Sequence, residues 1–210
     1  MNKQIDNKEN IVFIMILRIV AAFAVIIIHT KTLTNFDTKG YYFLHCCMLW
    51  CVPLFFMISG YIFLGIKTYL TYKHVTKNIV KFFFALFTIG WFYAFIQRVF
   101  ENGISVYTFV NSFIDVIKGN LWAHMWYVYS IIGIYLVLPV LSAFVSNNKK
   151  NLYTLTLICG VFEIIFKDIS TVFEIGFSFP LSGYCFYVLM GATLCVMEER
   201  TLKKLFVPSV

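Results

Sequence analysis

Two ionisable side chains lie within an otherwise apolar stretch near the N-terminus, LRIVAAFAVIIIH at residues 17–29. Arg18 and His29 are separated by 11 positions, which in a helix is three turns plus about 20°, so both would lie on one face. Their Cα atoms would be about 16 Å apart. Two side chains at this separation cannot hold one small atom, but they can hold two parts of one long, thin molecule.

Each of the two residues also has a simpler interpretation. The side chain of Arg18 can extend to the nearer membrane surface, and His29 can meet water at the other end of the helix. Ala22 and Val25 lie between them on the same stripe, where a small residue leaves room for a ligand or for close helix packing. Because ionisable groups inside a membrane usually face the bundle interior and mark function, the shared face favours a functional pair.

The composition predicts an all-α, polytopic membrane bundle that forms a single domain, residues 1–210. The chain is 60% hydrophobic and 13% charged, whereas a soluble domain contains about 25% charged residues. The net charge of +7 is distributed between the apolar blocks, so there is no basic face for nucleic acid. Strands of a membrane barrel would alternate apolar and polar residues. These blocks do not, which leaves helices as the spanning elements.

Six apolar blocks are long enough, or nearly so, to cross a hydrocarbon layer of about 30 Å as helices. They cover residues 11–31, 43–66, 79–100, 124–145, 152–167 and 179–197. Arg18 interrupts the first block and no small-residue cleavage site follows it, so we read it as a membrane helix and not as a signal peptide. With the N-terminus inside, the inner segments carry eleven Lys and Arg residues and the outer segments five. This bias predicts that both termini are cytoplasmic.

Residues 104–118 form a shorter, amphipathic segment. One helical face carries its large apolar residues and the opposite face its polar residues. The apolar set is Val106, Phe109, Val110, Phe113 and Ile117, and the polar set is Thr108, Asn111, Ser112 and Asp115. Because about 15 residues cannot span a bilayer, we expect a helix at the outer interface; the alternative is a partly ordered loop.

The six cysteines all lie in apolar blocks, where we expect them to act as small packing residues. Cys47 and Cys51 are one helical turn apart. However, the sequence offers no second ligand pair at zinc-finger spacing. We therefore expect no metal.

Four segments, in the right order, resemble the membrane acyltransferase 3 family. The first is Arg18 and His29 with ten residues between them, and the second is VPLFFMISGYIFL at 52–64, close to VPxFFxISGY. HMWYVYSIIGIYLVLPVL at 124–141 is similar to HLWFLYxLIGxYLxLPxL, and SGYCFYVLMGATL at 182–194 is similar to a later glycine-containing helix of that family. Together these segments cover the whole chain.

The resemblance implies a plasma-membrane enzyme that moves an acyl group, commonly acetyl, from cytoplasmic acyl-CoA to a hydroxyl of a sugar or cell-envelope glycan. Arg18 and His29 correspond to the family's essential arginine and histidine. A guanidinium suits an anionic donor, and an imidazole suits general-base catalysis on the acceptor hydroxyl. We expect direct attack of that hydroxyl on the thioester. A covalent acyl-enzyme is the competing route.

Further candidates for substrate binding each have a structural alternative. Ser59 precedes Gly60 in a small polar break that is either part of the site or a packing notch. His124 begins the fourth block, in an aromatic belt or beside the substrate. Glu163 is predicted to lie at the level of His29 and would orient it, bind the acceptor hydroxyl, or lie at the interface.

Lys73, Lys77 and Lys81 follow the second block at positions i, i+4 and i+8, on one helical face. They would bind anionic lipid or attract the phosphates of CoA. The family commonly has an RxxRxxP pattern here, which this chain lacks. Its lysines offer charge attraction without bidentate recognition.

Two alternative functions follow from other features. A transporter or flippase would use broken helices, for which Pro53 and Pro139 are available, although the sequence has no repeat symmetry. The family usually has more membrane helices than these six. We therefore expect a truncated, N-terminal portion of such a domain, and an inactive remnant is the second alternative.

Overall fold

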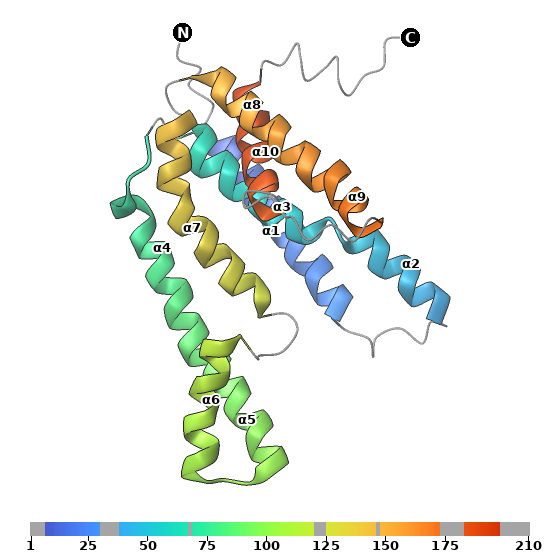
Figure 1. Ribbon diagram of the computed structural model, residues 1–210, viewed down its shortest axis with the longest axis vertical. Coiled ribbons are helices and arrows are strands. Elements are labelled where there is room, and N and C mark those ends of the chain that lie inside the picture. The colour runs from blue at the N-terminus through green and yellow to red at the C-terminus, as the bar shows by residue number, and fades with distance from the viewer. Residues whose placement is uncertain are drawn as a thin grey trace. The chain divides into compact units, whose positions relative to one another are not determined.

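The computed structural model describes residues 7–29, 38–66, 69–119, 125–145, 148–172 and 183–197, and all regular elements in these ranges are helices (Figure 1). The chain forms two compact units, Met1–Ile66 with Lys149–Val210, and Lys67–Asn148. Four helical runs in the described ranges are long and apolar enough to cross a membrane. They are Val12–His29, Tyr42–Ile66, Tyr72–Asn102 and Trp126–Val145. The predicted all-α membrane bundle is thereby confirmed.

These four runs correspond to the first four predicted blocks. The fifth block lies in a continuous helix that comprises α8 (Lys149–Gly160), a π-helical segment η4 (Val161–Phe166) and α9 (Lys167–Val172). This run is not among the four candidate spans, because every 18-residue stretch of it contains at least three charged residues. They are drawn from Lys149, Lys150, Glu163, Lys167 and Asp168. The sixth block is described from Gly183 onward and contains α10 (Tyr184–Val196), an apolar helix shorter than a full span.

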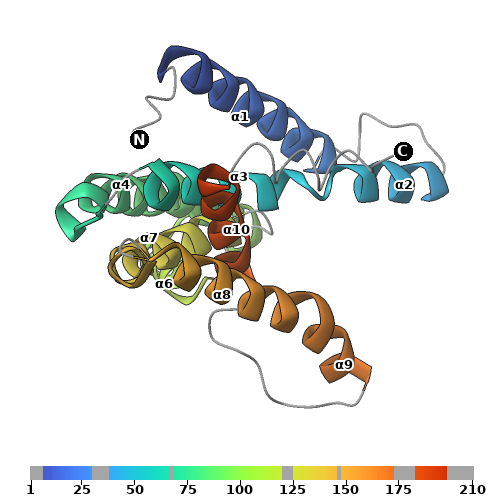
Figure 2. The same cartoon turned by 90° about the horizontal axis from the view of Figure 1, so that it is seen from above.

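In the first unit, one helix packs between two others. It comprises α3 (Cys51–Gly60) and the π-helical segment η2 (Tyr61–Ile66), and it follows α2 (Thr38–Met48). α1 (Asn7–His29) packs on α3 and α2, whereas α10 packs on α3, η2 and α8 (Figure 2). Pro53 is in the first turn of α3, where a missing N–H is tolerated.

The contact between α1 and α3 is made by small residues. Ala21 and Ala24 are buried against Cys51, and partly buried apolar side chains such as Val25 and Phe55 surround them. Small residues let the two backbones approach, which is how membrane helices gain van der Waals contact when lipid is as apolar as the protein.

The contact between α3 and α10 is closer still, because glycines on both helices meet the opposite backbone. A Cβ atom on Gly60 would overlap the carbonyl group of Val188, and one on Gly191 would overlap the carbonyl group of Met57. Gly60 is therefore a packing notch, as one of the two interpretations of the Ser59–Gly60 break predicted.

The second unit is built on one long helix. α4 (Tyr72–Ala85), the π-helical segment η3 (Leu86–Gly90) and α5 (Trp91–Asn102) follow one another without a break, over 31 residues or about 46 Å. The helix begins seven residues before the predicted block. The reason is a cap: the backbone N–H of Thr71 donates to Nδ1 of His74 at 3.2 Å, which satisfies a donor at the helix start.

Two helices pack along this long helix. α7 (Trp126–Val145) lies along α4, and α6 (Val106–Lys118) folds back along α5 (Figure 1). The backbone N–H of Leu70 donates to Oγ of Ser142 in α7 at 2.9 Å. The predicted helix at 104–118 is confirmed, with Ser105 as its N-cap and Gly119, at a φ of 75°, ending it in the left-handed conformation.

The glycine contact predicts that Gly60→Ala and Gly191→Ala each destabilise the first unit. The new methyl group would overlap backbone and force α3 and α10 apart, at a cost of about 1–3 kcal/mol or more. Thermal unfolding in detergent, followed by circular dichroism, measures the effect.

Gly133→Ala is the matched control. A Cβ at Gly133 meets no atom within 4 Å, and alanine favours a helix over glycine by about 0.5–1 kcal/mol. This variant should unfold at or above the wild-type temperature. Wild-type unfolding of the Gly60 and Gly191 variants would contradict the close backbone contact.

Candidate functional site

Arg18 and His29 lie on α1, which continues without interruption from Asn7 to His29, so the helical spacing places both on one face. Both side chains are exposed. Ala21 and Ala24, which meet α3, lie about 60–140° around the helix axis from this stripe. The side chains of Arg18 and His29 therefore lie to one side of the α1–α3 contact and are not buried in it.

Arg18 makes no hydrogen bond or ion pair with any residue that the structure describes. The other arginine in the described part of the chain, Arg98, is bound to a carboxylate. The guanidinium of Arg18 is thus available for an anionic ligand, which a planar, permanently charged group binds well.

Ser59 is buried, and its hydroxyl donates a hydrogen bond to the backbone carbonyl of Phe55 at 3.0 Å. This is the usual partner of a serine inside a helix. A substrate contact by Ser59 requires that the hydroxyl exchange this bond for another.

Glu163 lies in η4, where Oε2 accepts a hydrogen bond from the backbone N–H of Gly183 at 2.6 Å. Gly183 directly precedes α10 and has a φ of 71°. A carboxylate at a helix N-terminus satisfies an otherwise free donor and interacts favourably with the helix dipole. Sequence reasoning missed this partner because Gly183 is 20 positions away.

Lys73, Lys77 and Lys81 lie on α4 with all three side chains exposed, so the predicted helical face is confirmed. They belong to the unit Lys67–Asn148, whereas Arg18, His29, Ser59 and Glu163 belong to the other unit.

His124 lies outside the residues that the structure describes. Within the described ranges, no three side chains of the types His, Cys, Asp and Glu come together as a metal site.

The helices and the Arg18–His29 stripe define a membrane protein with an ionisable pair along its first span. A family model described as an acyltransferase domain matches residues 11–208, nearly the whole chain. The chain belongs to this family, the membrane acyltransferase 3 family that its motifs resemble, and it is a membrane acyltransferase. No curated protein and no solved structure matches the chain.

The contact of Glu163 with Gly183 predicts that Glu163→Ala lowers stability. Loss of a capping acceptor costs about 0.5–2 kcal/mol. Glu163→Gln, which keeps an amide oxygen as acceptor, should lose less. Unfolding in detergent compares the two variants, and wild-type stability of Glu163→Ala would show that the bond does not hold α10 in place.

Proposed function

We propose that this acyltransferase moves an acetyl group from cytoplasmic acetyl-CoA to a hydroxyl of a sugar or cell-envelope glycan at the plasma membrane. The observation that carries the proposal is the pair of Arg18 and His29 on one exposed face of α1 in a chain of this family. Their separation of about 16 Å suits a long, thin donor with an anionic end and a reactive end.

Arg18 is assigned to the donor. With the N-terminus inside, it lies in the cytoplasmic half of the first span, where its guanidinium pairs with anionic oxygens of CoA. Lys73, Lys77 and Lys81 lie on the same side in this topology. Three positive charges on one exposed helical face attract the phosphates of CoA from solution.

His29 is assigned to the acceptor as general base. Its neutral imidazole takes the proton of the acceptor hydroxyl as the oxygen attacks the thioester carbonyl carbon. The tetrahedral intermediate then collapses, the carbon–sulfur bond breaks, and the imidazolium returns the proton to the leaving thiolate. The products are the acetyl ester and free CoA, and no metal takes part.

Replacement of His29 tests the general base. His29→Ala should lower kcat at least 100-fold, since a positioned acid–base group contributes about 10²–10⁴-fold. The assay follows labelled acetyl from acetyl-CoA into an envelope glycan fraction, in membranes that carry the full chain.

Ile27→Ala is the control, because Ile27 is exposed at the same end of α1 and lies about 160° around the axis from His29. It should retain wild-type turnover. Normal acetyl transfer by the His29→Ala variant would show that His29 is not the general base.

A charge change on α4 tests the attraction of the donor. Lys77→Gln should raise KM for acetyl-CoA about 1.4- to 5-fold with kcat unchanged, the range of about 0.2–1 kcal/mol for exposed charge interactions. The effect should shrink as salt is added. Lys149→Gln, an exposed lysine at the start of α8, is the control. An equal change in KM for Lys77→Gln and Lys149→Gln would show that the α4 lysines do not attract acetyl-CoA more than other exposed lysines do.

A further inference from the structure

α7 defines where the hydrocarbon layer lies on the second unit. This candidate span, Trp126–Val145, is 20 residues long, or about 30 Å of helix, and its sequence contains no Asp, Glu, Lys, Arg or His. The hydrocarbon layer is also about 30 Å thick. α7 therefore fills the layer from end to end, and with the N-terminus of the chain inside, Trp126 is at the outer surface and Val145 at the inner surface.

Contacts between α7 and α4 give the depth of Lys81. The two helices are antiparallel, since Leu70 is bound to Ser142 and, further along α4, the ring of Phe82 lies on that of Tyr135 with centroids 5.6 Å apart. Tyr135 is 10 residues from the inner end of α7, or about 15 Å. Lys81 is adjacent to Phe82, so it lies near the middle of the layer.

The lysine face of α4 is not covered by α7. Its members, Lys73, Lys77 and Lys81, are all exposed. Phe82, which contacts α7, lies about 100–180° around the helix axis from them. The four-carbon stem of a lysine is too short to carry the ammonium group of Lys81 over about 15 Å to the inner surface.

A second lysine reaches a similar depth from the other side. α6 forms a hairpin with α5, residues 91–118, and returns from the outer tip of this hairpin toward the middle of α7. Val116 packs with Leu86 and Ile132, and Ile132 is six residues from the outer end of α7, or about 9 Å. Lys118 is exposed and lies two residues further along α6, about 12 Å from the outer surface.

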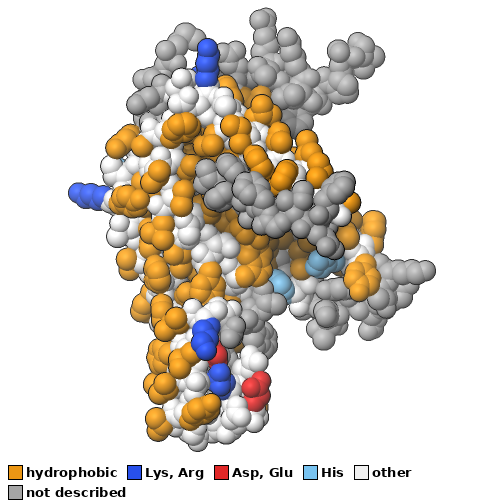
Figure 3. Space-filling view, viewed as in Figure 1, with side chains coloured by type: hydrophobic (Ala, Val, Ile, Leu, Met, Phe, Trp, Pro, Cys, Tyr) orange, Lys and Arg blue, Asp and Glu red, His pale blue; other side chains and the backbone are white. Residues whose placement is uncertain are grey.

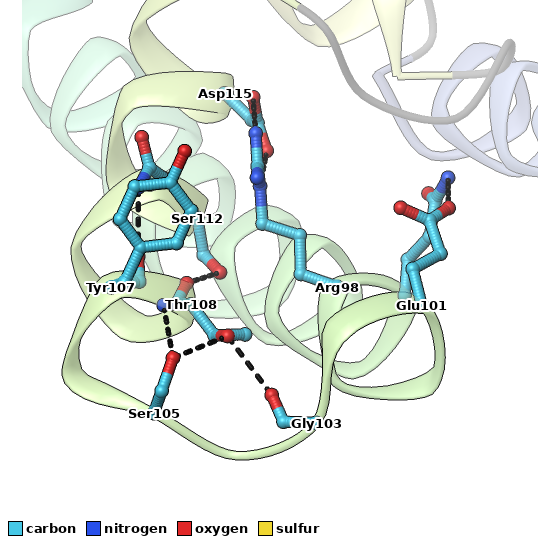
Figure 4. Close-up of polar contacts among 10 residues, drawn as sticks. Arg98, Glu101, Gly103, Ser105, Tyr107, Thr108, Ser112 and Asp115 are labelled. Carbon is cyan, nitrogen blue, oxygen red and sulfur yellow. Dashed lines mark hydrogen bonds and ion pairs between the residues drawn. The ribbon is translucent and has the colours of Figure 1, made fainter.

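Lys118 ends a polar stripe that follows the hairpin. Asn111, Asp115 and Lys118 are spaced i, i+4 and i+7 on one face of α6, where such residues are neighbours. Asp115 binds Arg98 of α5 through two hydrogen bonds, Nε to Oδ2 and Nη2 to Oδ1, the second at 2.9 Å (Figure 4). Figure 3 shows the charged side chains of the hairpin gathered in one strip. The stripe leads from the tip of the hairpin to the depth of Lys118.

The second unit has no carboxylate that could neutralise the lysine face of α4. Its two acidic residues, Glu101 and Asp115, both belong to the hairpin. There Gln97 donates to Glu101 at 3.2 Å and Arg98 binds Asp115. Because charged side chains at membrane depth are stable where they are paired or face a water-filled space, an exposed Lys81 requires water.

We propose that water enters the hydrocarbon layer along the second unit from both surfaces. The lysine face of α4 lines an inner inlet, and the polar stripe of α6 lines an outer inlet. Both end near the middle of α7, so the barrier between inner and outer water is thinner here than the bilayer. The inner inlet admits an anionic solute as far as Lys81, whereas a phospholipid headgroup remains at the surface. The proposal does not rest on acetyl-CoA as the donor.

Labelling of the native lysines in the full chain tests the two inlets. The chain is reconstituted in vesicles of phosphatidylethanolamine and phosphatidylglycerol, and a sulfonated succinimidyl ester, which is excluded from hydrocarbon, is supplied on both sides of the membrane. Mass spectrometry measures the acylation rate of each lysine. We expect Lys81 and Lys118 to react at rates within several-fold of that of Lys73. If either is protected in vesicles and reacts only after detergent is added, the proposal is overturned.

A probe on α7 at the depth of Lys81 is the matched control. p-Acetylphenylalanine replaces Leu136, which is next to Tyr135 and 48% exposed, and is coupled to a nitroxide. Electron paramagnetic resonance should show frequent collisions with oxygen, which dissolves in hydrocarbon, and several-fold fewer with a water-soluble nickel complex than the same label at Asn102 in the hairpin tip. Equal collisions with the nickel complex at both positions would place the middle of α7 outside the bilayer and overturn the proposal.

Discussion

The approach of α3 and α10 at Gly60 and Gly191 is the constraint on which the first unit depends. Where each helix presents hydrogen in place of a side chain to the other's carbonyl groups, neither can rotate or slide without a steric clash. The other contacts of α10 follow from this placement. Phe56 stacks on Tyr184 with ring centroids 4.6 Å apart, and the hydroxyls of Thr156 and Thr193 lie 2.9 Å apart.

The helix that carries Arg18 and His29 depends on the same constraint. α1 packs on α3 through Ala21, Ala24 and Cys51, and α3 is fixed in turn by its glycine contact with α10. The orientation of the Arg18–His29 stripe is thus set by α3, the neighbour on which α1 packs. The described ionisable residues differ in whether they take part in helix packing. Arg98 and Glu163 have partners that hold helices together, whereas Arg18 has none among the described residues and remains available.

Sequence reasoning recovered what local pattern determines. The length of the apolar blocks predicted the four candidate spans. The helical spacing of apolar and polar residues predicted the helix at 106–118. It could not recover contacts between distant segments, such as Gly60 with Val188 or Glu163 with Gly183, because a single glycine or carboxylate does not specify its partner. For α6, the pattern defined the two faces but not which residues meet α5. Asp115 of the polar face binds Arg98, and Phe109 and Phe113 of the apolar face pack on Trp91.

The π-helical segment η3 between α4 and α5 has a consequence for the direction of the hairpin. A π-helical turn contains more residues than an α-helical turn, so every side chain beyond Gly90 is displaced in angular phase from the position that α4 alone would give it. The lysines before the segment and Arg98 after it are therefore not on one helical wheel. The number of residues from Leu86 to Gly90 therefore determines the direction in which α5 and α6 leave the long helix. A single insertion or deletion there would rotate α6 away from Leu86 and Ile132, on which its Val116 packs.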